Sequence, residues 1–172
     1  MPAHLNAHQD ELAELALKRV VASGAEYGDI RILDSTAQII RGEDRRIASV
    51  RESQDSGFGI RVLYHGAWGF AASSVLSLEE TPRVAELAIE IAKASASVAR
   101  EKVKLADEPI HCDRVVTAKR TDPFAVALEN KTALLLDTME AVHRQPGIVR
   151  SSAGLWARRD LKLFVSTEGS RL

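Results

Sequence analysis

Residues 57–73 (GFGIRVLYHGAWGFAAS) restrict the possible folds of this chain more than any other stretch. Apolar side chains alternate with other residues over 58–64 and again over 68–72, the period of a half-buried β-strand. His65 and Gly66 stand between the two runs, and glycine readily adopts the positive φ that a tight hairpin turn needs. The stretch therefore predicts strand, turn, strand.

The glycines at the start of this stretch do not predict a phosphate-binding loop. A dinucleotide loop needs a further glycine three residues after Gly59, and a helix must follow it. Position 62 is Val62, and a strand is predicted to follow. Gly57 and Gly59 are therefore interpreted as residues that ease a bulge or the entry into a strand.

The residues before this stretch predict one helix and two strands. Residues 9–23 have the pattern of an amphipathic helix, with an apolar stripe of Leu12, Leu15, Ala16 and Val20. Residues 29–40 alternate like a strand, Arg41-Gly42-Glu43-Asp44 predicts a turn, and residues 47–53 predict the next strand. With the hairpin above, this makes a helix followed by a four-strand antiparallel meander.

A second helix is predicted over residues 82–98, after a short turn at 77–80. Ser77 could open a capping box, whereas Thr81 could cap a helix that has Pro82 at its first position; the second alternative is favoured because proline disrupts a helix interior. The predicted buried stripe is Val84, Leu87, Ala88, Ile91 and Val98.

The second half of the chain predicts a linker, a helix and two strands. Residues 100–119 are irregular, although Val115-Val116 could belong to a strand. Residues 128–144 predict a third helix, with an apolar face of Leu128, Leu135, Met139 and Val142. Two last strands, 148–158 and 161–167, are expected to join near Arg159-Asp160. The predicted class is α+β, with antiparallel sheets of meander strands packed against amphipathic helices. Residues 1–99 and 100–172 are its two sections, and both are predicted to belong to one N-terminal domain.

Composition excludes several classes of protein. The 172 residues have a formal net charge of −1, which argues against nucleic acid as a partner. The single cysteine, Cys112, fits a reducing compartment. The N-terminal residues lack the basic start and apolar core of a signal peptide. No apolar run approaches the length that spans a bilayer. The expectation is a cytoplasmic protein without a membrane partner.

Three segments carry a resemblance to a known family: the glycines and aromatics of residues 57–70, the Asp-Pro-Phe step ahead of the third helix, and the closing strand-to-turn step. The residues are Gly57, Gly59, Arg61, Gly66, Trp68, Gly69 and Phe70, then Thr121-Asp122-Pro123-Phe124 with Leu128-Glu129, then Val165-Ser166-Thr167-Glu168-Gly169. In this order they resemble the N-terminal domain of the TldD/PmbA family, zinc metallopeptidases also named modulators of DNA gyrase. Ala127 and Asn130 depart from the pattern and weaken a helix cap by about 1 kcal/mol.

The resemblance implies where the chemistry resides. The family carries His-Glu-x-x-x-His in a C-terminal catalytic domain, and this chain has no such motif. The intact protein would then be a zinc-dependent peptidase that cleaves small or unfolded peptides, with zinc ligands outside this chain. These residues would form a non-catalytic substrate-access and assembly domain. A homodimer or heterodimer with a family member is also implied.

The chain's own nucleophiles and metal ligands predict no site. None of the histidines, His4, His8, His65, His111 and His143, is followed by Glu. His4 and His8 lie four apart without an acidic partner between them. Cys112 beside His111 is interpreted as a structural thiol, because neighbours on a strand point to opposite faces.

The remaining candidates are also assigned structural roles. Ser73-Ser74 and Ser151-Ser152 lack the Gly-x-Ser-x-Gly elbow, and Asp29, Asp34 and Asp44 are too scattered to predict a carboxylate pair. Arg45-Arg46 and Arg158-Arg159 are interpreted as solvated charges, and Trp68 and Trp156 as core residues. The sequence therefore predicts no catalytic, cofactor-binding or metal-binding residue in this chain.

Two alternatives stay open. The chain could be a stand-alone α+β module that binds proteins or peptides. It could also be the N-terminal part of a metal-free partner subunit of the same family. A turn at Glu168-Gly169-Ser170 should lead into a further strand, so we expect the residues to belong to a longer protein.

Overall fold

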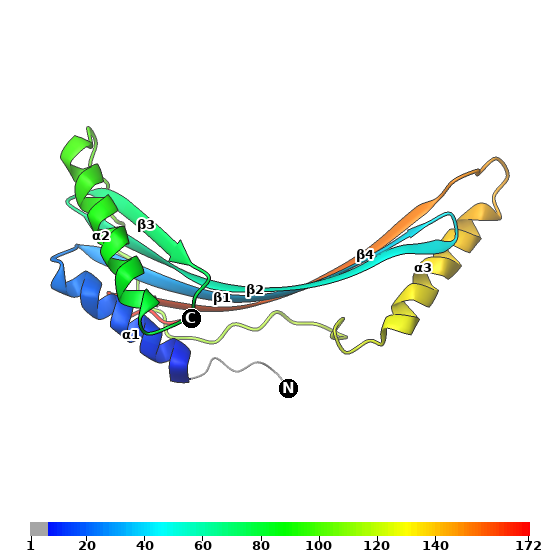
Figure 1. The fold of residues 1–172 in the computed structure, drawn as a ribbon, viewed down its shortest axis with the longest axis horizontal. Helices are drawn as coiled ribbons and strands as arrows, with labels where there is room; N and C mark the ends of the chain where they lie inside the picture. Colours follow the sequence, from blue (N-terminus) through cyan, green and yellow to red (C-terminus); the bar gives the residue numbers. More distant parts are fainter. Residues whose placement is uncertain (1–6) are drawn as a thin grey trace. The chain divides into compact units, whose positions relative to one another are not determined.

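The computed structural model describes residues 7–172. Its described part contains three helices and one four-stranded antiparallel sheet with strand order β3-β2-β1-β4 (Figure 1). The elements are α1 (Ala7–Ala22), β1 (Tyr27–Glu43), β2 (Arg46–Tyr64), β3 (Ala67–Ser73), α2 (Glu80–Val98), α3 (Leu128–His143) and β4 (Ser152–Ser166). The predicted α+β class is confirmed.

The chain divides into two compact units. Unit 1 consists of residues 7–34, 56–115 and 161–172, and unit 2 of residues 35–55 and 116–160. Strands β1, β2 and β4 each contribute residues to both units. None of the described helices combines the length and the apolar character needed to cross a membrane.

The core of unit 1 lies between one sheet face and the helices α1 and α2, which pack side by side (Figure 1). Alternate strand residues point to the helices because side chains along a strand alternate between faces. The strand side chains buried there are Ile30, Ile32, Phe58, Ile60, Val62, Ala71 and Leu163, and the helix side chains include Leu12, Ala16, Val20, Val84, Ala88 and Ala92.

The hairpin predicted from the sequence is confirmed. Strands β2 and β3 pair antiparallel from Phe58 opposite Ser73 to Tyr64 opposite Ala67. His65 and Gly66 form the turn, both with positive φ (47° and 77°), the geometry of a two-residue type I′ turn.

Helix α2 approaches strand β3 closely at Gly69. A Cβ at position 69 would overlap the backbone carbonyl of Ala88 and lie 2.8 Å from the Cβ of Ala92. Only glycine allows this contact, and small residues on the helix are needed opposite it.

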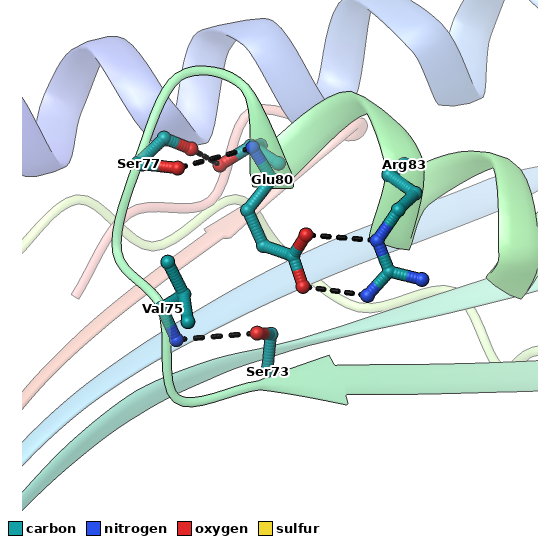
Figure 2. Close-up of polar contacts among 6 residues, drawn as sticks. Ser73, Val75, Ser77, Glu80 and Arg83 are labelled. Atoms are coloured by element: carbon teal, nitrogen blue, oxygen red, sulfur yellow. Dashed lines mark hydrogen bonds and ion pairs between the residues drawn. The ribbon is translucent and has the colours of Figure 1, made fainter.

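Hydrogen bonds from Ser77 and Arg83 fix the start of α2 (Figure 2). Ser77 Oγ accepts the backbone N–H of Glu80 at 3.1 Å, and Thr81 Oγ1 donates to the carbonyl of Ser77 at 2.9 Å. Arg83 donates two hydrogen bonds to the Glu80 carboxylate, at 2.8 and 2.6 Å. The helix begins at Glu80, and Pro82 lies in its first turn, where a missing N–H is tolerated. The capping hydroxyl is thus that of Ser77, not that of Thr81.

Unit 2 packs α3 against its part of the sheet. Leu135 and Met139 are buried, and Lys131 Nζ donates to Gln38 Oε1 on β1 at 2.5 Å. Asp44 and Arg45 connect β1 to β2, both with positive φ (46° and 63°).

The predicted strand breaks are wrong in three places. The turn lies at Asp44-Arg45, so Arg41, Gly42 and Glu43 remain in β1. Residues 46–64 form one strand, not two, and residues 152–166 likewise form one strand. The polar residues taken for breaks are exposed side chains on strands that pair through their backbones, which does not depend on side-chain polarity.

The predicted helix faces are partly wrong. Leu87, Ile91 and Val98 of α2 are exposed, whereas Ala85, Ile89 and Ala92 are buried. The close approach at Gly69 places Ala88 and Ala92 at the contact with β3. The buried face of α2 is therefore the side that carries Ala85, Ile89 and Ala92, not the side that carries Leu87 and Ile91.

Four further predicted positions differ from the structure. Leu128 and Val142 lie at 38% and 39% exposure at the ends of α3. Val115 and Val116 belong to no strand and are exposed. The segment around Cys112 instead forms a short bridge with Arg171.

Candidate functional site

The candidate site is a groove of about 370 Å³ in unit 1. Its strand residues are Tyr27, Arg61, Trp68 and Phe164, and segments from 105–111 and 166–172 complete the lining. These strand residues alternate with the core residues, so they lie on the sheet face opposite α1 and α2. We call this site the outer-face groove.

A buried ion pair lies beneath the groove. The side chain of Asp29 is fully buried, and its Oδ2 accepts hydrogen bonds from Arg61 Nε at 2.9 Å and Nη2 at 2.6 Å. Arg31 Nε lies 3.4 Å from Oδ1, within ion-pair reach, but Oδ1 accepts no aligned hydrogen bond. Asp29 raises the pKa of Arg61 above its usual value, so the guanidinium is permanently charged.

Two aromatic rings hold the guanidinium in place. Arg61 lies over the Trp68 ring at 5.1 Å from its centroid, a cation–π geometry. Tyr27 meets Trp68 edge to face at 5.9 Å. Burial, followed by the neighbouring Asp29 carboxylate, raises the pKa of Tyr27 to about 12, so its phenol stays protonated and can donate a hydrogen bond.

This arrangement suits binding more than chemistry. Trp68, Tyr27 and Phe164 present aromatic surface, and Arg61 keeps 38% of its side chain exposed. The Asp29 carboxylate accepts two of the five N–H donors of Arg61, so the remaining donors can reach a carbonyl or carboxylate. The groove can therefore hold an apolar side chain while Arg61 bonds an adjacent oxygen.

The structure separates most of the histidines. His111 lines the outer-face groove, His65 occupies the β2–β3 turn, and His8 Nε2 lies 3.3 Å from the carbonyl of Leu76. His143 of unit 2 lies 4.0 Å from Asp44. His4 lies outside the described residues. Within residues 7–172, no three His, Cys, Asp or Glu side chains gather as a metal site would require.

The other candidates also lie apart. Asp44 binds the backbone N–H of Ser151 at 2.9 Å in unit 2, whereas Asp29 belongs to unit 1. Cys112 is exposed, and its Sγ lies 3.5 Å from the carbonyl of Gly169. Ser73 Oγ accepts the N–H of Val75 at 3.1 Å in the turn after β3.

The arginines and tryptophans differ in their surroundings. Arg45 lies 3.8 Å from Glu140, and Arg158 Nε bonds Asp160 at 2.8 Å. Arg159 stacks over the ring of Phe124 at 4.9 Å, so it is not a solvated charge. The core assignment of Trp156 is wrong, since 64% of it is exposed.

The sequence interpretation missed Tyr27 and the pairing of Asp29 with Arg61. The available signal was the alternation of side chains along the strand, because Tyr27, Asp29 and Arg31 alternate with the apolar Ile30 and Ile32. Three polar or amphipathic side chains on one strand face predict a polar surface there, but they do not identify Arg61 as the residue that pairs with Asp29.

Comparisons with known proteins agree with the fold. Residues 28–92 match the family profile described as PmbA/TldA metallopeptidase domain 1. The chain is 28% identical over 149 residues to a metalloprotease of Methanocaldococcus jannaschii, covering 86% of this chain and 32% of the relative. It is 29% identical over 145 residues to a metalloprotease of Methanothermobacter thermautotrophicus, covering 84% and 30%. The chain thus spans about a third of these relatives.

Solved structures share the fold. A modulator of DNA gyrase from Bacteroides thetaiotaomicron aligns with a TM-score of 0.79 at 11% identity, covering 98% of this chain and 39% of that one. TldE from Thermococcus kodakarensis aligns with a TM-score of 0.65 at 12% identity, covering 96% and 36%. The family profile and these relatives together show that the chain resembles the PmbA/TldD family, and residues 28–92 are the part that matches its first domain.

Proposed function

We propose that these residues are the N-terminal substrate-access and assembly domain of a longer, cytoplasmic zinc metallopeptidase that cleaves small or unfolded peptides. The observation that carries the proposal is the match to domain 1 in a chain that spans 32% of a metalloprotease relative. Zinc would be held by residues outside this chain, where it would polarise the peptide carbonyl and activate a water molecule.

The outer-face groove supplies a means of contact with peptides. The aromatic rings of Tyr27, Trp68 and Phe164 would receive one side chain of the substrate, and Arg61 would donate a hydrogen bond to a nearby peptide carbonyl. Both contacts need an extended or unfolded chain, because a folded substrate keeps its carbonyls bonded internally. The groove would therefore favour unfolded peptides without taking part in hydrolysis.

Assembly is the second part of the proposal. Strands β3 and β4 are the two edges of the sheet, and unpaired edges are templates for another chain. A homodimer or a heterodimer with a related subunit would cover such an edge.

The test compares the whole gene product with a version that lacks residues 1–172. Substrates are one protein in its native form and the same protein reduced and unfolded. The proposal predicts that the whole enzyme cleaves only the unfolded form and that deletion removes this discrimination. The same discrimination ratio in both versions would refute the access role.

Trp68→Ala in the whole enzyme provides a second test should the truncated enzyme not fold. It removes a binding contact distant from the chemistry, so KM for unfolded substrates should rise while kcat stays the same. An unchanged KM would contradict the role of the outer-face groove.

A further inference from the structure

Strand β4 presents a strip of residues on the helix-free face of unit 2. The β4 strip consists of Gly154, Trp156, Arg158 and Asp160, which alternate along the strand. Ser35 Oγ of β1 donates to Asp160 Oδ1 at 2.7 Å, so Asp160 shares a face with Ser35. Helix α3 lies on the other face, where Lys131 bonds Gln38 and Arg159 stacks on Phe124.

The backbone of the β4 strip points away from β1. At one end of β4, Ser151 accepts a hydrogen bond from Asp44 N–H, and at the other Thr167 N–H donates to Gly28, so odd-numbered residues face β1. Even-numbered Phe164 and Ser166 instead bond residues 172 and 170. Backbone groups alternate in direction along an antiparallel strand.

The same alternation leaves part of the edge open. The N–H and C=O groups of Trp156 and Arg158 point away from β1, and among the described residues no further strand lies beyond β4 in the sheet. An unpaired edge of this kind accepts an additional strand.

Trp156 is exposed and packs against a glycine. Its side chain is 64% exposed, and its ring lies against Gly154, where an added Cβ would be 2.8 Å from Cζ3. A tryptophan side chain has only two rotatable bonds and so loses little entropy on binding, and tryptophan is enriched among residues that dominate binding energy.

The segment that carries the β4 strip is net basic. Residues 150–160 contain Arg150, Arg158 and Arg159 but only one acidic residue, Asp160. Arg159 lies on the face of α3, and Asp55 of β2 lies near Arg158. Arg150 and Arg158 have ion-pair partners in Asp44 and Asp160, yet 81% and 63% of their side chains are exposed. This charge favours an acidic partner.

We propose that the β4 strip binds an extended acidic peptide, which adds to β4 as a further strand. An apolar side chain of the peptide lies on Trp156, and an acidic side chain two residues along lies beside Arg158. Main-chain hydrogen bonds supply affinity, and the alternating side chains supply selectivity. That the ligand is a peptide follows from the proposed function. The inference adds the class of peptide and a second surface that contacts it.

Fluorescence anisotropy with synthetic peptides tests the inference on the 172-residue chain. The probe is a fluorescein-labelled nonapeptide with the sequence Val-Thr-Glu-Thr-Val-Thr-Glu-Thr-Val, in which Val and Glu alternate along one face of the added strand. The matched peptides replace Glu with Lys, or carry N-methyl groups on alternate backbone nitrogens. We expect binding of the first peptide, about tenfold weaker binding of the Lys peptide, and loss of binding on N-methylation, which removes only the hydrogen bonds of the added strand.

Two variants locate the site. Trp156→Ala should weaken binding of the Val-Glu peptide about tenfold. Arg158→Pro removes an N–H that points away from β1, so the sheet should still form while binding of the Val-Glu peptide is lost. Arg158→Ala is its control, because it keeps the N–H and removes only the charge. Circular dichroism and the thermal midpoint check folding, and the N-methylated peptide keeps the test valid if Arg158→Pro does not fold.

Four results would overturn the inference. One is equal binding of the N-methylated peptide, and another is binding that Trp156→Ala leaves unchanged but Trp68→Ala abolishes, which would leave the proposed function intact. The third is concentration-dependent self-association that Trp156→Ala removes, which would assign the edge to a second copy. If no peptide of either charge pattern binds the chain at all, both the inference and the proposed peptide-handling function are contradicted.

Discussion

Asp29 is a buried carboxylate that takes its hydrogen bonds from Arg61. Its carboxylate is fully buried and accepts both of its aligned hydrogen bonds from Arg61. Burying an ion pair contributes little net stability, because desolvation offsets the attraction. Removing one partner is different, since it leaves the other charge buried without compensation.

Arg61→Ala should therefore lower the free energy of unfolding by about 2–4 kcal/mol. Asp29→Asn in the same chain should recover part of that loss, because the neutral amide no longer needs a cation. Urea denaturation of both single variants and of the double variant measures the coupling. Strictly additive losses would contradict the described pair.

Glu80 should make stability depend on pH in the acid range. Hydrogen bonds from Arg83, followed by one from Ser73, lower the pKa of Glu80 to about 2 from 4.5. Because the pKa of Glu80 is lower in the folded state, the contribution of its carboxylate to folding stability is complete above pH 4.5 and is lost as the pH falls toward 2.

Glu80→Gln should flatten the decline of stability between pH 4.5 and 2 and have little effect at lower pH. Thermal midpoints across this range measure the difference, with the exposed neighbour Glu79→Gln as control. If Glu80→Gln and the parent chain lose stability in parallel, the ion pair with Arg83 does not form in solution.

At the scale of elements, the contact between α2 and β3 depends on one glycine. Gly69→Ala places a methyl group against the backbone of Ala88 and Ala92, and the helix must shift to admit it. We expect a loss of about 2–3 kcal/mol in the free energy of unfolding. Gly59→Ala is the matched control, because its Cβ would meet only the ring of Phe70, which is 57% exposed and free to swing away. Equal losses for the two variants would contradict the close approach.

The sequence predicted the kinds of element more accurately than their lengths. Helices α1 and α3 and the hairpin at His65-Gly66 follow from local periodicity and turn chemistry. The turn predicted at 41–44 lies later, at Asp44-Arg45, because Gly42 suggested a break although Asp44 and Arg45 are the residues with positive φ. Gly42 instead lies within β1.

The same error concealed the candidate site. A single long hairpin brings the strand around Asp29 beside the strand around Arg61, whereas two shorter strands would not. The sequence points to Arg61 only through the family resemblance, and the scattered positions of Asp29, Asp34 and Asp44 predict no carboxylate pair. Pairing across the hairpin is a property of register, which alternation alone does not determine.

For the whole molecule, we propose that this chain binds peptides and that residues beyond it carry the chemistry. The family profile and the metalloprotease relatives support a common origin with peptidases. The outer-face groove and the β4 strip are both surfaces for extended peptides in our proposals, and neither includes a group of metal ligands.

Zinc content per chain, measured side by side on these 172 residues and on the full gene product, tests the central claim most directly. Both proteins are equilibrated with excess zinc, passed over a desalting column and assayed by atomic emission. The account predicts about one zinc per chain in the full product and none retained by the 172 residues. Stoichiometric zinc in the 172 residues would contradict it, and zinc in neither would favour the metal-free partner subunit over the peptidase.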